Sequence, residues 1–294
     1  MTLVLEASDV AAALEDVDVL EAVEAVHADL GAGRMQQPAP VAMSGADDAL
    51  FLPMAVRSDR LGLVAVKLMA DIPHNASRGL PTQRSTILVS SAMTGECLGV
   101  LDGKDITRAR TAAASVVATQ HLARSHNTTL GLVGAGNLAV EHLRAFAKVW
   151  HFERVLLWSR SAATTGRFLE AVGDDLARRC TVVGGPRQVA EECDVLCTLT
   201  PSVRPVVEGG WLHAGQHVNA VGARPRPTHR ELDGPAMARG TVFVDSRATA
   251  WSKSGDLLEA VVEGAVPQDL AVAALVLEVA RERGLGTTVP TSGR

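Results

Sequence analysis

The sequence predicts an α/β protein, with a doubly wound parallel sheet in its second half and a β-rich α+β domain in its first half. Three observations lead to this prediction. Strands and helices alternate after residue 125, short β-like runs fill residues 39–100, and a glycine turn joins a strand to a helix within residues 128–146. Alternation of this kind produces right-handed βαβ crossovers, which place the strands in one parallel sheet between helices.

The first half opens with helical signals and continues with strands. Ser8 and Asp9 open a short helix, and Asp18 with Glu21 has capping-box spacing ahead of a second helix. A long alanine-rich helix is expected over residues 105–124. Between these helices, turn-forming residues separate four runs that are typical of strands, namely PVAM, LFLPMAV, LGLVAVKLM and STILVSS.

In the second half, helices are expected from Leu138 to Val149, from about Gly166 to Arg179, and onward from Pro186. The strands expected between and after them are LGLVG, RVLLW, TVV, DVLCTLT, HVNAVG and TVFVD. A last helix, from Gln268 to Arg283, has an apolar face that should dock on the first half.

Length and charge narrow the class of function. The 294 residues allow two domains, each with its own core. With 28 basic and 33 acidic residues the net charge is −5, which favours a small-molecule substrate over nucleic acid or a membrane surface. The apolar runs are shorter than the ~20 residues of a membrane-spanning helix, and the first residues do not resemble a signal peptide. A cytoplasmic protein is therefore expected.

A dinucleotide-binding turn is predicted at Gly134-Ala-Gly136, between a short apolar strand and a helix. Gly134 permits the tight turn, Gly136 lets the backbone approach a pyrophosphate, and Ala139 lets the helix pack closely on the strand. The N–H groups of the first helical turn, at Asn137 and Leu138, would face the anion. Glycine strings also make ordinary turns, but the flanking strand and helix favour a Rossmann fold.

The residues that end the second strand of such a fold select the cofactor. An acid there would accept hydrogen bonds from the ribose hydroxyls of NAD(H), whereas this chain has Ser159-Arg160-Ser161. Hydroxyls and a guanidinium suit a 2′-phosphate, so NADP(H) is favoured over NAD(H). The alternative is a solvated Arg160 with NAD(H) as cofactor. Further cofactor contacts are expected at the later strand ends, namely Thr198, Thr200 and Val221.

Several segments together resemble the ornithine cyclodeaminase and mu-crystallin family. They are VKLMADIPHN, STILVSSAMTGECLGVLDGKDITRARTAA, GLVGAGNLAVEHL, CTLTPSVRPVV, HAGQHVNAVGA and SGDLLEAV, spread over residues 54–261. The resemblance implies a homodimeric NAD(P)(H)-dependent enzyme that acts on the C–N bond of an amino acid or imine. The junction between the long alanine-rich helix and the nucleotide-binding strand is the expected domain boundary, which gives a substrate-binding and dimerisation domain, residues 1–124 with 267–294, and a dinucleotide-binding domain, residues 125–266.

Two site residues are carried over by this resemblance. Lys67 matches a lysine near the reacting carbon, and Arg110 matches an arginine that binds the substrate carboxylate with both arms of its guanidinium. On pattern alone, a lysine in the run LGLVAVKLMA is more typical of an edge strand, and Arg110 of a helix surface. A lysine among apolar neighbours would have a lowered pKa, which suits proton transfer.

The chain departs from the family pattern at three places. Pro40 stands where a second arginine for the substrate carboxylate is expected, and Arg224 stands where cyclodeaminases carry an aspartate. Together with Arg226, Arg224 could bind an additional anionic group, although a surface role for Arg226 is equally compatible with the sequence. A glycine-rich segment before the last helix is also missing, which predicts a more open site or a larger substrate.

No metal site is expected. The spacing of His213 and His217 binds zinc only on one helix face, and the Ala-Gly between them argues against a helix. His229 could protonate an imine nitrogen. The alternative is that His229 is a surface histidine in a loop. The four cysteines form no C-x-x-C pair and are expected to be reduced core residues.

These observations predict an NADPH-dependent reductase of a C=N bond in an amino-acid-like imine or ketimine. Two alternatives stay open, an ornithine- or lysine-type cyclodeaminase with bound NAD, and a non-catalytic NADPH-binding protein like a crystallin. The sequence does not specify the substrate or the reaction direction.

Overall fold

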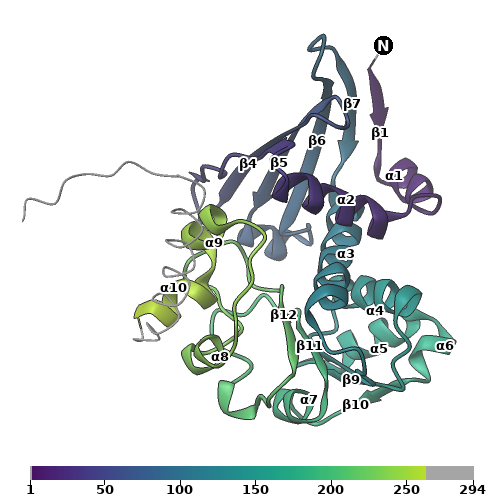
Figure 1. Cartoon of the computed structure of the whole chain (residues 1–294), viewed down its shortest axis with the longest axis vertical. Helices are drawn as coiled ribbons and strands as arrows, with labels where there is room; N and C mark the ends of the chain where they lie inside the picture. Colours follow the sequence, from purple (N-terminus) through teal and green to yellow (C-terminus); the bar gives the residue numbers. More distant parts are fainter. Residues whose placement is uncertain (1, 263–294) are drawn as a thin grey trace, which may run out of the picture.

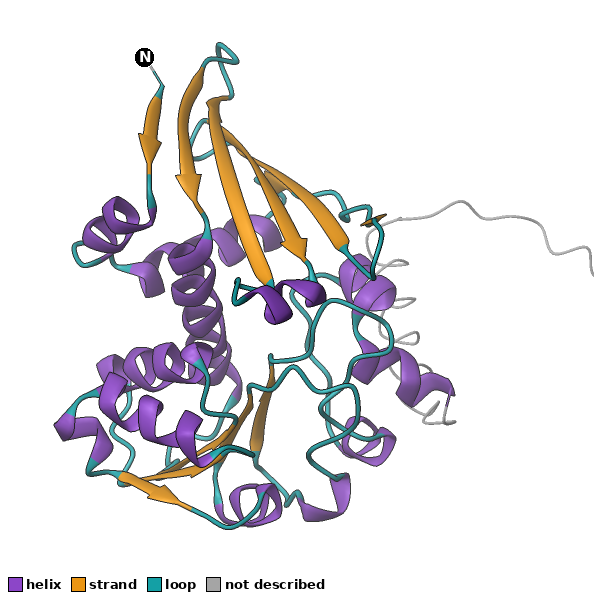
Figure 2. Cartoon of the chain, turned by 180° about the vertical axis from the view of Figure 1, so that it is seen from behind, coloured by secondary structure: helices purple, strands orange, loops and turns teal. Residues whose placement is uncertain are grey.

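The computed structural model describes residues 2–262 and contains two β-sheets connected by the long helix α3 (Lys104–Leu122) (Figure 1). Figure 2 shows the two groups of strands separated along α3. No helix among the described residues is long and apolar enough to cross a membrane. The cofactor and substrate residues predicted above therefore come from two structural units that α3 joins.

The first sheet has the strand order β1-β7-β6-β5-β4-β2, with β3 paired to β4. The strands are β1 (Leu3–Leu5), β2 (Met35–Gln36), β3 (Met43–Ser44), β4 (Leu50–Ser58), β5 (Leu63–Asp71), β6 (Gln83–Ser91) and β7 (Cys97–Asp102). Strands β4 to β7 form an antiparallel meander, and β1 pairs with β7 in parallel. The strand β1 was not predicted, because three residues give no readable alternation.

Three helical segments accompany this sheet, namely α1 (Ala7–Leu14), α2 (Val19–Gly31) and the 3-10 helix η1 (Pro73–Arg78). The cap predicted for α2 is confirmed, since the Asp18 side chain accepts a hydrogen bond from the Glu21 N–H at 3.0 Å. The start predicted for α1 is shifted. Its N-cap is Glu6, and Ser8 lies in the first turn because the Asp9 carboxylate accepts from the Glu6 N–H.

The second sheet is a five-stranded parallel sheet with the order β10-β9-β8-β11-β12, which confirms the predicted fold class. Its strands are β8 (Thr129–Val133), β9 (Arg154–Trp158), β10 (Cys180–Val182), β11 (Val195–Thr198) and β12 (His217–Ala220). The connecting helices are α4 (Asn137–Val149), α5 (Ala162–Val172), α6 (Asp174–Ala177) and α7 (Pro186–Glu192). The helix expected near residues 166–179 is divided, because Gly173 has a φ of 82°.

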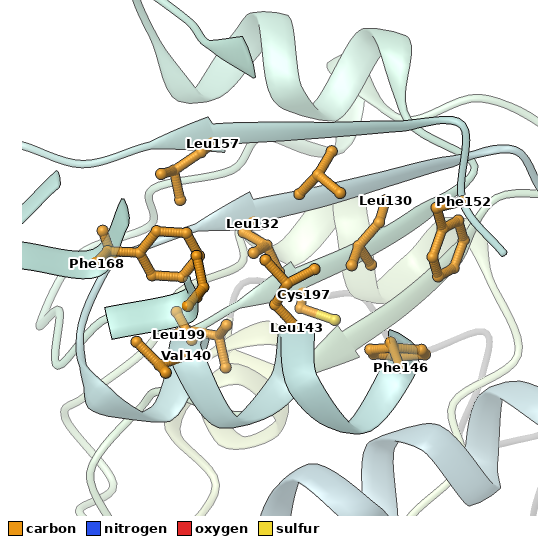
Figure 3. Close-up of a cluster of buried hydrophobic side chains, with 14 of the residues drawn as sticks. Leu130, Leu132, Val140, Leu143, Phe146, Phe152, Leu157, Phe168, Cys197 and Leu199 are labelled. Atoms are coloured by element: carbon orange, nitrogen blue, oxygen red, sulfur yellow. The ribbon is translucent and has the colours of Figure 1, made fainter. Parts of the chain in front are cut away.

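Apolar cores cover both faces of this sheet. On one face, Leu130, Leu132 and Leu157 pack against Leu143 and Phe146 of α4 (Figure 3). On the other face, a second cluster lies under α7 and is formed by Val133, Leu156, Val189, Leu196 and their neighbours. Buried strands with apolar residues on both faces are typical of a parallel sheet between helices.

The last described segments are η2 (Gly209–Trp211), α8 (Gly234–Arg239), α9 (Arg247–Lys253) and α10 (Gly255–Val262). The strand predicted at TVFVD is wrong, since residues 241–245 pair with no strand among the described residues. Phe243 and Val244 are exposed there, so the segment lacks the burial that would stabilise a strand. The helix predicted from Gln268 to Arg283 lies outside the described residues.

Candidate active site

The glycine turn at the end of β8 has the geometry that a dinucleotide pyrophosphate requires. Gly134 has a φ of 115°, and a Cβ there would lie 2.7 Å from the Leu199 carbonyl oxygen. Gly136 is the N-cap of α4 with no side-chain cap, and a Cβ at this position would meet nothing within 4 Å. Ala139, in the first turn of α4, is fully buried. The residues therefore fit a phosphate group at an uncapped helix N-terminus.

Ser159, Arg160 and Ser161 follow β9 directly beside this turn, since the Gly134 N–H donates to the carbonyl of the preceding Trp158 at 2.8 Å. Ser161 caps α5 by accepting from the Thr164 N–H at 3.3 Å. Arg160 is exposed, and no acid in the described part of the chain forms an ion pair with it. Its guanidinium is available for an anionic ligand beside the turn.

A buried carboxylate, which the sequence did not reveal, holds the ends of β11 and β12. Glu231 is 0% exposed and accepts hydrogen bonds from the hydroxyls of Thr198 (2.9 Å) and Thr200 (2.7 Å) and from the N–H groups of Thr200 (2.6 Å) and Gly222 (2.7 Å). Burial raises the pKa of Glu231 to about 7, against the effect of these donors. Asp256 in turn accepts from the backbone N–H of Glu231 at 2.8 Å.

This arrangement affects the predicted cofactor contacts at the strand ends. The hydroxyls of Thr198 and Thr200 are both directed to Glu231, and the Val221 N–H donates to the Thr198 carbonyl at 3.1 Å. Glu231 therefore fixes the residues where the nicotinamide end of a dinucleotide is expected. Direct contact of these residues with a cofactor stays a prediction.

Lys67 lies on β5 and points toward α3, where its Nζ donates to the Thr107 hydroxyl at 2.7 Å. Burial lowers the pKa of Lys67 to about 8, and the positive charge of Arg110 adds to this effect. The edge-strand interpretation of Lys67 is wrong, because β5 pairs with β4 on one side and β6 on the other. Protection of a sheet edge therefore does not explain why a half-buried lysine occupies this central strand.

Arg110 lies one helical turn after Thr107 on α3, and its charge is close enough to Lys67 to lower the lysine pKa. Its side chain is exposed to a cleft, whose walls nevertheless desolvate the guanidinium and lower its pKa. The negative charge of Asp245, on the segment after α8, acts in the opposite direction. The structure thus brings the two predicted catalytic residues together.

The loop after β12 is tied to the first sheet by ion pairs. Asp71 is 0% exposed, and its Oδ2 accepts from the Arg226 Nε at 2.9 Å while its Oδ1 lies 3.5 Å from the Arg224 Nη1. Arg226 also pairs with Asp48 at 2.7 Å and is 11% exposed, so the surface role considered for Arg226 is wrong. Arg224 shares Asp71 with Arg226, and its contact with a substrate stays a prediction.

We expect Asp71→Ala to lower the free energy of unfolding by about 3 kcal/mol, because it leaves the Arg226 charge buried without its main partner. Urea unfolding measures this change. Asp48→Asn is the matched control, since Asp48 is exposed and its φ of 60° is tolerated by asparagine. Equal losses in the two variants would contradict the structural role of Asp71.

Two adjoining cavities lie beside α9 and the loop after β12. A cleft of about 790 Å³ contains Arg110, Asn219, Arg224 and Asp245 in its walls. A smaller cavity of about 350 Å³ is lined by Pro40, Leu50, Arg226 and neighbouring residues. Pro225 and Lys253 line both cavities, so these two residues form their common boundary.

The remaining candidates have ordinary structural partners. His213 bonds with the Cys193 carbonyl at 3.0 Å and His217 with the Asn219 amide oxygen at 3.3 Å. His229 is partly buried and contacts Thr228. Within residues 2–262, no three His, Cys, Asp or Glu side chains are grouped to hold a metal. Two cysteines are buried and two are partly buried, all four as free thiols.

A model of the ornithine cyclodeaminase/mu-crystallin family matches residues 1–281. The chain belongs to this family. Among its relatives, the ketimine reductase mu-crystallin of Rattus norvegicus is 33% identical over 227 residues, which cover 77% of this chain and 71% of the relative. The family assignment agrees with the resemblance on which Lys67 and Arg110 were selected.

Two solved structures of this family share the whole architecture. The Δ1-pyrroline-2-carboxylate reductase of Thermococcus litoralis, in complex with NADH and L-proline, has a TM-score of 0.83 at 28% identity and covers 98% of this chain and 100% of its own. An archaeal alanine dehydrogenase dimer with bound NAD has a TM-score of 0.82 at 26% identity, with coverage of 98% and 99%. Both structures contain a bound nicotinamide cofactor.

Proposed function

We propose that this chain is an NAD(P)H-dependent oxidoreductase that reduces the C=N bond of an amino-acid-like imine or ketimine. The observation that carries this proposal is the proximity of Lys67 to Arg110, which lines the larger cleft together with the residues of β12. The named activities of the relatives, ketimine reductase and pyrroline-2-carboxylate reductase, support it. The glycine turn at β8 supports the use of a dinucleotide.

The proposed reaction uses three groups, namely a nicotinamide, Arg110 and Lys67. A bound nicotinamide supplies the hydride that forms the new C–H bond at the imine carbon. Arg110 binds the substrate carboxylate, which fixes the imine beside Lys67. With a pKa of about 8, Lys67 is mostly protonated at neutral pH and donates its proton to the nitrogen, where the π electron pair of the C=N bond becomes an N–H bond.

Lys67 must regain its proton after each turnover. After donation, the neutral amine of Lys67 stays hydrogen-bonded to Thr107 and takes up a proton from solvent before the next turnover. The neighbouring charge of Arg110 favours this donation, because it makes the protonated lysine less stable. Glu231 acts at a distance by holding Thr200 and Gly222 in place.

NADP(H) is the proposed cofactor, on the basis of the hydroxyls of Ser159 and Ser161 and of Arg160, which forms no ion pair with a described residue. We expect Arg160→Ala to weaken NADPH binding by about ten-fold or more, the effect of losing a hydrogen bond to a charged group, and to leave NADH binding unchanged. Fluorescence titration with both nucleotides measures this. Arg178→Ala, at an exposed arginine after α6, is the control. Equal effects of Arg160→Ala on both nucleotides would contradict the assignment.

We propose that the chain forms a homodimer through the outer face of the first sheet. Val66, Leu68 and Leu88 are exposed on β5 and β6, and Val66 lies opposite Leu88 in the register. Side chains alternate along a strand, so this apolar face is the one opposite Lys67. An exposed group of this kind on a sheet marks an interaction surface.

The double variant Leu68→Glu, Leu88→Glu should convert a dimer into monomers, because it introduces charge into the proposed interface. Light scattering after size-exclusion chromatography measures the molar mass. Val149→Glu, Val182→Glu introduces the same charges at exposed apolar positions outside this sheet and should leave the mass unchanged. A dimer in both double variants would place the interface elsewhere.

The function itself is tested by mixing the protein with NADPH and a panel of cyclic and acyclic imino acids while absorbance is followed. Oxidation of NADPH by an imine is the expected result. Ammonia released from ornithine or lysine without added NADPH would instead identify a cyclodeaminase. Tight nucleotide binding without turnover of any imine or diamino acid would identify a binding protein.

A further inference from the structure

Lys253 is the last residue of α9 and lies at the boundary of the two cavities. It is partly buried, and no hydrogen bond or ion pair of its side chain with the described residues is present. Its surroundings include Pro40, Ala42 and Pro225, which offer no counter-charge. Burial also lowers the pKa of Lys253. A partly desolvated ammonium without an anionic partner is unfavourable, so the position favours an anionic ligand.

The other cations around the two cavities already have partners. Arg226 is paired with Asp71 and Asp48, and Arg224 shares Asp71. Arg239 donates to the Gly209 carbonyl at 2.7 Å. Arg110 has a nearby negative charge, that of Asp245. Lys253 therefore differs from every other described cation in these walls.

The acidic residues in the cavity walls form no ion pair with Lys253. Among the described residues these acids are Asp245 and Asp256. Asp245 acts on Arg110, and Asp256 is buried with its Oδ1 bound to the N–H groups of Glu231 and Leu232 at 2.8 Å. Among the described residues, Lys253 of α9 is thus a cation without an anionic partner in the same cleft that Arg110 of α3 lines.

We propose that Lys253 binds a second carboxylate of the substrate, so that the substrate is an imine derived from a 2-oxo dicarboxylic acid. This inference rests on the proposed imine reduction, in which Arg110 binds the carboxylate next to the imine carbon. One ammonium balances one carboxylate, and the two cations that line this cleft would each bind one carboxylate of the substrate. The reduction itself consumes one hydride and one proton and leaves the distal carboxylate unchanged.

The test compares two substrates that differ only in the distal carboxylate. Imines are formed with excess methylamine from 2-oxoglutarate and from 2-oxopentanoate, which have the same carbon chain, and kcat/KM is measured with NADPH. The wild-type protein should prefer the dicarboxylic imine by about ten-fold or more, the effect of one hydrogen bond to a charged group. Lys253→Met should remove this preference by lowering kcat/KM for the dicarboxylic imine alone.

Two further variants test whether the effect of Lys253→Met comes from the loss of its charge. Lys253→Arg should retain most of the preference, because it keeps the positive charge. Lys148→Met removes an exposed lysine at the end of α4 and should change neither substrate. Equal rates for both imines in the wild type, or an unchanged preference in Lys253→Met, would overturn the proposal.

A binding measurement distinguishes failure of this inference from failure of the proposed function. Calorimetry in the presence of NADP compares glutarate with pentanoate, neither of which can react. Tighter binding of glutarate, lost in Lys253→Met, without turnover of any imine would retain the carboxylate site and contradict the reductase. Turnover of imines with equal binding of both acids would retain the reductase and overturn the second carboxylate site.

Discussion

Replacing Lys67 by Met should lower kcat for imine reduction by about 10²–10⁴-fold, the range contributed by a positioned acid. Met has a similar length and fits the apolar surroundings of β5, so the fold should persist. Nucleotide binding should be unchanged, because Lys67 belongs to the first sheet and the glycine turn to the second. Steady-state absorbance gives kcat, and fluorescence titration gives the nucleotide Kd.

The pH dependence of the wild-type rate offers a second readout of Lys67. Only the protonated amine can donate, so kcat/KM for reduction should fall as the pH rises above about 8, the pKa of Lys67. Lys67→Met should lack this alkaline limb. Lys104→Met, at an exposed lysine that begins α3, serves as the control and should keep it. A Lys67→Met protein with full activity would remove Lys67 from the mechanism.

Replacing Glu231 by Leu should lower the free energy of unfolding by about 1–3 kcal/mol for each buried donor that loses its acceptor. The N–H groups of Thr200 and Gly222 are two such donors, at 2.6 and 2.7 Å from the carboxylate. Nucleotide binding should weaken as well, since these groups fix the ends of β11 and β12. Urea unfolding at pH 7 and titration with NADPH measure the two effects.

The raised pKa of Glu231 predicts how stability changes with pH. Its pKa is about 7 in the folded protein and near the ordinary value of 4.5 in the unfolded chain, so the folded state binds more protons between these values. The free energy of unfolding should therefore fall as the pH rises from about 4.5 to 7. Glu231→Gln cannot titrate and should lack this contribution.

The exposed Glu153 provides the control for this comparison, because Glu153→Gln removes a carboxylate from the surface. Urea unfolding of the three proteins between pH 5 and pH 8 gives the required curves. The wild type and Glu153→Gln should show parallel curves, and Glu231→Gln should lack the decrease in the free energy of unfolding that deprotonation of Glu231 contributes. Parallel curves for all three would show that Glu231 titrates alike in the folded and unfolded states.

The parts of the fold that the sequence predicted correctly depend on local requirements. Gly134 could be interpreted because the tight turn before a helix requires a positive φ, and Gly136 because a backbone that approaches a pyrophosphate closely cannot carry a side chain. The capping residue of α2, Asp18, is local in the same sense. The strand prediction at TVFVD was wrong, because its residues favour a strand but the described fold supplies no partner strand.

The features that the sequence did not reveal join residues far apart in the chain. Glu231 accepts from Thr198, which is 33 positions away, and Arg226 pairs with Asp71 over 155 positions. No periodicity or motif marks such contacts, because each depends on the tertiary arrangement. Likewise, the position of β5 inside its sheet, which excludes an edge role for Lys67, follows only from the strand order.

Transfer of a deuteride label tests the central claim most directly. The protein is incubated with NADPH deuterated at C4 of the nicotinamide and with an imino acid that it turns over, and the product is analysed by mass spectrometry and NMR. The proposed reaction predicts one deuterium on the carbon bonded to nitrogen. A product that carries no label on that carbon would contradict hydride transfer to a C=N bond.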